Sequence, residues 1–136
     1  MKTIIINISL TFLLILAGII FQSCDDTISI QDVDNKIIPD SNVSFGQHIY
    51  PVFQVKCFSC HGNGIAQGGL DLTLWTNIVD GRVVVPGDTL TSLLVWTIDR
   101  PPRAGFPPMP PNFSPQLTPN QIKGVKTWIA EGALNN

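Results

Sequence analysis

The stretch Cys57-Phe58-Ser59-Cys60-His61 decides the fold of this 136-residue chain. Two thiols three positions apart lie on one turn of a helix, where each can add to one vinyl group of a haem to form a thioether. The histidine that follows then lies under the ring with an imidazole nitrogen aimed at the iron. C-x-x-C-H is the attachment pattern of c-type haem. The pattern therefore predicts one covalent haem c held by Cys57 and Cys60, with His61 as an axial ligand to the iron.

Two other chemistries can use a C-x-x-C pair. A structural zinc ion wants four ligands at tetrahedral geometry, and after Cys24 the chain offers only His48 and Met109 as further soft donors. Zinc rarely takes a thioether, and the adjacent Cys60 and His61 are poorly placed to bind one small ion together. A redox-active C-x-x-C would need a βαβ context, which the pattern does not indicate. A zinc or disulfide module on the cell surface stays as an alternative.

Met109 is the predicted second axial ligand. It is the only methionine besides Met1, and eight of the chain's eleven prolines lie between Pro101 and Pro119. Because proline fixes φ, we expect a stiff surface loop that loses little entropy when a sulfur binds iron. His48 is the competing ligand. Apolar neighbours at helical spacing turn it away from the core, where a partly exposed surface histidine is expected.

The N-terminus has the layout of an export signal. Lys2 precedes an uncharged apolar run, Ile4–Phe21, and the small residue Ser23 stands directly before Cys24. This order resembles the lipobox of a bacterial lipoprotein, which implies a signal peptide over 1–23 and a lipid anchor on Cys24. The alternative is an uncleaved membrane span with an incidental cysteine. Either arrangement holds the rest of the chain at a membrane, outside the cytoplasm.

Composition separates a tether from one small domain. Residues 25–40 hold five of the chain's ten acidic side chains against a single base, Lys36. This bias predicts a solvated, extended acidic tether over 24–41. The remaining residues, 42–136, are then expected to form the single small domain that carries the haem. A formal net charge of −2 excludes a strongly basic nucleic-acid binder, so no nucleic-acid partner is expected.

Hydrophobic spacing predicts the elements of the domain. A helix is expected over 44–56, with Pro51 kinking or restarting it. Leu70, Leu72 and Leu74 alternate, which predicts a short extended stretch with one apolar side against the haem. Asp88 is the expected N-cap of a helix whose apolar stripe is Leu90, Leu93, Leu94 and Ile98. A capping box at Thr118 starts the last helix, whose stripe is Ile122, Val125, Trp128 and Ile129 and whose stop is Gly132.

These blocks together resemble the planctomycete-type cytochrome c domain of exported bacterial proteins. The matching runs are Lys56–Gly62, Gly68–Leu72, Val85–Asp88, Ser92–Leu94, Met109–Pro111 and Trp128-Ile129. The resemblance implies an all-α, small monohaem cytochrome c fold: three to four short helices around a covalent haem, with a long proline-rich loop. It implies thioethers at Cys57 and Cys60, a proximal ligand at His61 and a distal ligand at Met109.

The expected function is therefore one-electron transfer outside the cytoplasm by a lipid-anchored monohaem c-type cytochrome, in the cell envelope. No paired acids or nucleophile with a base indicate an enzyme. The expected partners are redox proteins, with the membrane reached through the N-terminal lipid. A haem-based gas- or peroxide-binding protein with an open sixth site is the alternative. Arg100 and Arg103 are expected either to bind haem propionates or to solvate the loop that carries them.

Overall fold

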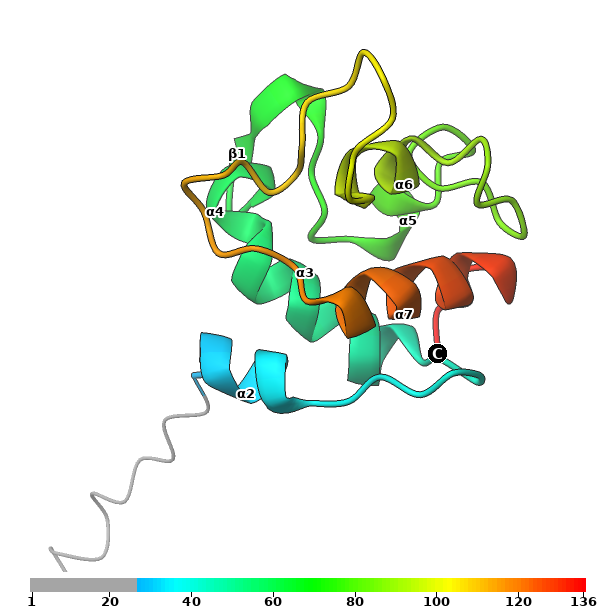
Figure 1. Cartoon of the computed structure of the whole chain (residues 1–136), viewed down its shortest axis with the longest axis horizontal. Coiled ribbons are helices and arrows are strands. Elements are labelled where there is room, and N and C mark those ends of the chain that lie inside the picture. Colours follow the sequence, from blue (N-terminus) through cyan, green and yellow to red (C-terminus); the bar gives the residue numbers. More distant parts are fainter. Residues whose placement is uncertain (1–26) are drawn as a thin grey trace, which may run out of the picture.

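The computed structural model describes residues 27–136, so the predicted signal peptide and the lipid on Cys24 lie outside the described residues. The described chain is mostly helical (Figure 1), in agreement with the expected all-α class, although residues 27–136 contain six α-helices and not the three to four that were expected. In chain order the elements are α2 (Ile30–Asn35), a π-helix (Phe45–Ile49), α3 (Tyr50–Lys56), α4 (Phe58–His61), β1 (Ile65–Ala66), a 3-10 turn (Gln67–Gly69), α5 (Trp75–Ile78), α6 (Leu93–Ile98) and α7 (Pro119–Ala130). No helix among these residues is both long and apolar enough to cross a bilayer.

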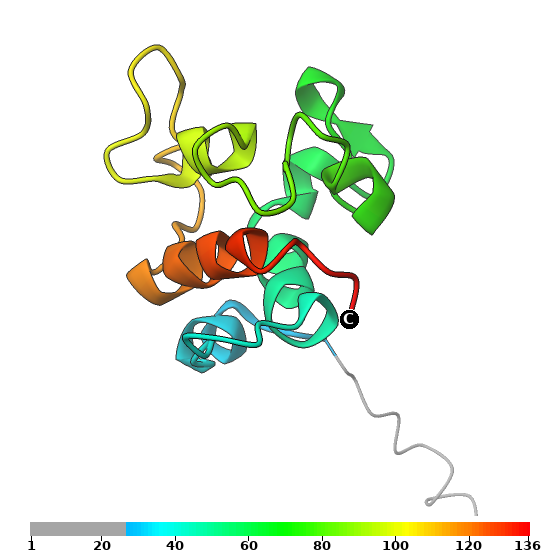
Figure 2. The same cartoon turned by 90° about the vertical axis from the view of Figure 1, so that its right-hand side faces the viewer.

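Helix α7 organises the core. It begins with the predicted capping box, in which the Thr118 hydroxyl accepts a hydrogen bond from the Gln121 amide and the Gln121 side chain accepts one from the Thr118 amide. Val125, Trp128 and Ile129 are completely buried, as their spacing predicted. The helix lies between α2 on one side and α6 on the other (Figure 2).

The first and last helical segments pack together through aromatic rings. Phe45 stacks on Trp128 with ring centroids 5.3 Å apart, and Tyr50 bridges Phe45 and Phe58 through edge-to-face contacts. Such pairs add about 0.5–1.5 kcal/mol each beyond the area they bury. These contacts fix the helical turn that carries the two cysteines against the core.

Pro51 restarts the first helix, as predicted. A π-helical turn ends at Ile49, and α3 begins with the proline in its first turn. Proline has no N–H to donate to the carbonyl four residues earlier. That carbonyl belongs to Gln47, and it accepts a hydrogen bond of 2.7 Å from the Lys36 ammonium instead. A side chain from the preceding segment thus replaces the donor that Pro51 lacks.

The extended acidic tether predicted over 24–41 is wrong for the part that the structure describes. A capping box between Ser29 and Asp32 starts α2, and Val33 and Ile38 are buried at 4% and 2% exposure. The acidic composition hid two apolar anchors spaced to reach the core. Asp34 also has a specific cation partner, Lys56, so part of the charge that suggested solvation belongs to an ion pair.

Two predictions about helix α6 and the stretch before it need correction. The α6 helix starts at Leu93 with Ser92 at the N-cap position, not at Asp88. Asp88 instead accepts hydrogen bonds from the amides of Leu90 and Thr91, closing a separate turn. Leu90 is therefore 80% exposed, outside the predicted stripe.

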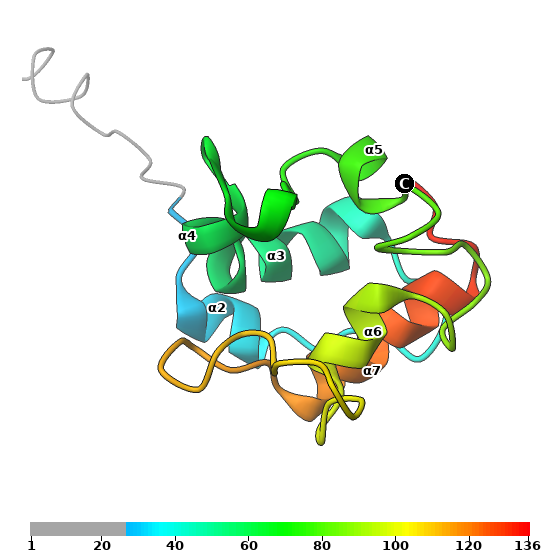
Figure 3. The ribbon, with the colours of Figure 1, turned by 90° about the horizontal axis from the view of Figure 1, so that it is seen from above.

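The alternating leucines form the expected extended stretch only in part. Leu72 is buried and Leu70 is half-buried, whereas Leu74 is 59% exposed at the start of α5. The amide of Leu72 donates to the His61 carbonyl at 2.7 Å, which ties this stretch to α4. The long segment between α6 and α7 is yellow to orange in Figure 3. Before it enters α7 it comes close to the last residue of α3, Lys56, which donates a hydrogen bond to the Gln116 carbonyl.

Candidate cofactor site

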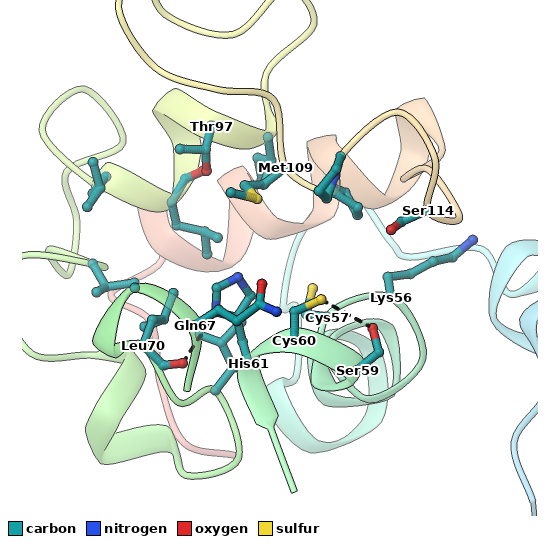
Figure 4. Close-up of a pocket in the computed structure, with 18 of the residues that line it drawn as sticks. Lys56, Cys57, Ser59, Cys60, His61, Gln67, Leu70, Thr97, Met109 and Ser114 are labelled. Atoms are coloured by element: carbon teal, nitrogen blue, oxygen red, sulfur yellow. Dashed lines mark hydrogen bonds between the residues drawn. The ribbon is translucent and has the colours of Figure 1, made fainter. Parts of the chain in front are cut away.

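Cys57, Cys60, His61 and Met109 line one cavity of about 370 Å³. The first three come from the end of α3 and from α4, whereas Met109 comes from the proline-rich segment after α6. Figure 4 shows the His61 ring and the Met109 side chain entering the cavity from opposite sides. Most of the remaining wall is apolar: Leu70, Leu72, Val83, Leu93, Leu94 and Ile98. A volume in this range with a few convergent polar groups is typical of a cofactor site.

Local backbone hydrogen bonds present the C-x-x-C-H side chains on one turn. The amides of Cys60 and His61 both donate to the Cys57 carbonyl, at 3.1 and 2.9 Å. Directly afterwards the chain turns through Asn63 and Gly64, whose φ angles are positive, and returns as β1. An Asn-Gly pair suits such a tight reversal. This return brings the chain to the cavity wall at Gln67.

The His61 ring is held by a backbone carbonyl. Its Nδ1 lies 3.3 Å from the Leu70 oxygen. When Nδ1 carries the proton and donates to that carbonyl, Nε2 is left unprotonated and free to bind a metal. Such a second contact is typical of metal-ligating histidines, because it fixes both the tautomer and the ring orientation.

The Cys57 thiol stays protonated at neutral pH in the chain without cofactor. Burial, and to a smaller extent the neighbouring Cys60, raise the pKa of Cys57 to about 12. Cys57 and Cys60 are both free. Among residues 27–136, no three His, Cys, Asp or Glu side chains come together to hold a metal ion, so the zinc alternative finds no ligand set there.

His48 lies elsewhere and is not among the described residues that line the cavity. It is half-buried, and its Nδ1 accepts a hydrogen bond from the Ser44 amide at 2.9 Å. Burial, and to a smaller extent the positive charge of Lys36, lower the pKa of His48. The ring therefore helps to close the start of the π-helix, on the surface that the sequence predicted for it.

The two arginines of the proline-rich segment have partners within the protein. Arg100 donates five hydrogen bonds to protein oxygens, one of them to the Met109 carbonyl. Arg103 lies over the Trp96 ring, 4.0 Å from its centroid. The arginine that lines the cavity is Arg82. Sequence reasoning missed Arg82, because no local pattern distinguishes it from an ordinary loop cation.

Lys56 is a second residue at the cavity that sequence reasoning did not single out. Its side chain is 1% exposed, and its ammonium lies 2.8 Å from an Asp34 oxygen. It also donates to the Gln116 carbonyl at 3.1 Å. The hydrogen bond from Lys56 lowers the pKa of Asp34. One buried cation thus joins α2, α3 and the segment that carries Met109.

The donor set fits a c-type haem. Two thiols stand three positions apart on one turn, an oriented imidazole follows them, and a thioether sulfur stands on the facing wall of the same apolar cavity. Imidazole and thioether are the axial ligands of many cytochromes c. Haem is largely apolar, so walls of leucine, valine and isoleucine suit its faces.

Comparison with known proteins agrees with this chemistry. Residues 57–112 match the family model described as planctomycete cytochrome C. The matched region begins at the first cysteine of the motif and includes Met109. This is the family that the sequence motifs indicated. No curated protein and no solved structure matches the chain.

Proposed function

Residues 57–112 of this chain match the planctomycete cytochrome C family model, and from this match we propose that the protein carries one covalent haem c and passes single electrons between partner proteins outside the cytoplasm. The observation that carries the proposal is the shared cavity of Cys57, Cys60, His61 and Met109. Haem, when bound, supplies the one-electron couple of its iron. The chain supplies attachment, axial ligands and a largely dry environment.

Each cysteine contributes one covalent bond in this proposal. Cys57 and Cys60 would each hold the haem through a thioether, in which the thiol sulfur bonds to one carbon of a vinyl group and the thiol hydrogen to the other. No external oxidant is needed for this addition. His61 would offer Nε2 to the iron, with its ring held by the Leu70 carbonyl. Met109 offers its sulfur from the facing loop, and a His/Met pair favours a high reduction potential.

Mutation of the two candidate distal ligands tests this assignment. In full-length protein made in a host with c-haem maturation machinery, Met109→Ala should abolish the far-red band of methionine-ligated ferric haem and lower the reduction potential. His48→Ala is the matched control and should leave both unchanged, because His48 does not line the cavity and its ring accepts a hydrogen bond from the Ser44 amide. If His48→Ala alters the oxidised spectrum and Met109→Ala does not, the ligand assignment is wrong. An unchanged spectrum in both variants would favour a gas- or peroxide-binding protein with an open sixth site.

We also propose that Cys24 anchors the protein to a bacterial membrane through lipid, so that the haem domain faces the periplasm or the cell surface. The proposal is supported by the order of Lys2, the apolar run Ile4–Phe21 and Ser23-Cys24. Stable anchoring takes more than one acyl chain. Metabolic labelling with a radioactive fatty acid should mark the wild type but not Cys24→Ala. If Cys24→Ala stays in the membrane and, apart from the substitution, has the same mass as the wild type, neither protein has been cleaved or acylated. That result would indicate an uncleaved membrane span instead.

A further inference from the structure

The guanidinium of Arg100 bridges the end of α6 and the Met109 backbone. Its Nη2 donates to the Met109 carbonyl at 3.0 Å and to Oε1 of Gln116 at 3.0 Å. Its Nη1 donates to three backbone carbonyls at the end of α6, those of Thr97, Ile98 and Asp99, at 3.2, 3.0 and 3.0 Å. The last carbonyls of a helix have no partner within the helix, so a cation at that end is favourable.

Gln116 continues the bridge on the other side of Met109. Its amide Nε2 donates to the carbonyls of Pro111 and Ser114 at 2.7 and 2.8 Å, and to that of Pro110 at 3.3 Å. Its own backbone carbonyl accepts from the buried Lys56 ammonium at 3.1 Å. Gln116 therefore closes the turn after Met109 and links it to the wall that carries Cys57.

The prolines explain why side chains must do this work. Met109 is flanked by Pro107, Pro108, Pro110 and Pro111, none of which has an N–H to donate. The segment therefore cannot fix itself by a backbone ladder, and its carbonyls need donors from elsewhere. The one amide at the centre, that of Met109, donates to the Thr97 carbonyl at 2.9 Å. Arg100 holds the carbonyl of the same residue, so both sides of the Met109 backbone are tied to the end of α6.

We infer that Arg100 and Gln116 are positioning residues: together they hold Met109 at the wall facing His61 by supplying the donors that its flanking prolines lack. The inference rests on the proposed role of Met109 as the distal ligand. A sulfur–iron bond is weak, and ordering a flexible loop when the bond forms would cost conformational entropy. A loop that is already ordered avoids this cost, so it favours the bond. Loss of the bridge should open the sixth position to other ligands.

The test uses full-length haem protein and four variants. Arg100→Ala and Gln116→Ala each remove the bridge, and Gln116→Ala does so without changing the charge. Arg103→Ala is the matched control, because it removes an equal charge from the same segment, where Arg103 stacks on Trp96. Arg100→Lys keeps the charge but has one compact ammonium, which cannot serve acceptors on both sides as the planar fork does.

Two readouts distinguish positioning from general stability: the far-red band of methionine-ligated ferric haem, and the affinity of the oxidised protein for added imidazole. Arg100→Ala, Arg100→Lys and Gln116→Ala should weaken the band and raise imidazole affinity about ten-fold, the size expected from one lost charge-assisted hydrogen bond. Arg103→Ala should match the wild type. Should Arg100→Ala fail to fold, Gln116→Ala and Arg100→Lys carry the comparison.

The outcomes separate this inference from the proposed function. If the wild type shows the band and the bridge variants bind imidazole as weakly as it does, the positioning role is wrong and the ligand assignment stands. If Arg103→Ala shifts as far as Arg100→Ala, loss of charge is the cause and the positioning role is again wrong. If the wild type lacks the band and Met109→Ala changes nothing, the ligand assignment fails and the inference fails with it.

Discussion

The Lys56 ammonium is the most deeply buried charge among the described residues, at 1% side-chain exposure, and it depends on one carboxylate. Asp34 remains 34% exposed, so solvent screens its attraction to Lys56. Breaking this pair should therefore cost less free energy than breaking a fully buried ion pair. The larger cost arises when the cation loses its anion and stays buried. Lys56 also holds the Gln116 carbonyl, so the ion pair supports the segment that carries Met109.

Asp34→Asn should lower the free energy of unfolding by about 2 kcal/mol at pH 7, less than the ~3–5 kcal/mol of a fully buried pair. The hydrogen bond from Lys56 lowers the folded-state pKa of Asp34 below its unfolded value of about 4. The pair therefore contributes fully above pH ~4 and is lost as pH falls through the folded-state pKa. Urea unfolding of both proteins at several pH values checks this. A difference that grows with acidity would contradict the assignment.

Gly62 is required because of a close approach and not because of its backbone angles. A Cβ at this position would lie 2.7 Å from Cγ of the buried Phe58 ring. Gly62→Ala should therefore destabilise the protein by about 1–3 kcal/mol, the usual cost of overpacking a core. Ser59→Ala, an exposed change on the same helix, is the control and should stay within ~0.5 kcal/mol. Equal melting temperatures for Gly62→Ala and the wild type would show that Phe58 moves aside at no cost.

At the scale of elements, the sequence predicted α7 well because all of its signals are local. The capping box, the apolar stripe and the glycine after the last turn lie within one continuous segment. The start of α6 was misplaced because two residues compete for the cap. Asp88 closes its own turn, and the buried Ser92 donates its hydroxyl to the Asp88 carbonyl at 2.6 Å. That arrangement depends on the fold around Val85 and is invisible in the spacing.

Helix α2 could not be predicted from composition for a similar reason. Much of its anchoring comes from partners more than eighty positions away. The Gln121 side chain donates to the Val33 carbonyl at 3.2 Å, and the Asn120 side-chain amide accepts from the Ile38 amide and donates to the Ile38 carbonyl. The candidate site divides in the same way. The motif indicates Cys57, Cys60 and His61 without structural knowledge, whereas the roles of Arg82, Arg100 and Gln116 depend on which loops meet.

The contact between α2's C-terminal extension and α7 is tight at one glycine. A Cβ on Gly124 would lie 2.6 Å from Cγ2 of Ile38. Helix propensity alone favours Gly124→Ala by up to ~1 kcal/mol, but overpacking should reverse the sign and destabilise the protein by about 1–2 kcal/mol. Ile38→Val should partly rescue Gly124→Ala in a double-mutant cycle, measured by thermal unfolding. A stabilising Gly124→Ala would contradict the packing described for this interface.

At the scale of the whole molecule, the cavity is central to the fold. It is walled by α4, the 70–72 stretch, α6 and the proline-rich segment. A domain of about 110 residues, 27–136, buries a modest core, so a ligand that fills the cavity and bonds to two walls should contribute much of the stability. Protein without haem should therefore melt at lower temperature and less cooperatively than the haem protein. Indistinguishable melting curves would contradict this dependence.

The most direct test of the central claim is whether haem is bonded to this chain. The full-length protein is purified from a host with c-haem maturation machinery, extracted with acidified acetone, and examined by its reduced-minus-oxidised visible spectrum. The account predicts that the haem spectrum stays with the extracted protein and that a Cys57→Ala, Cys60→Ala double variant loses it. A wild-type protein without retained haem, beside a control cytochrome c matured in the same cells, would contradict the account.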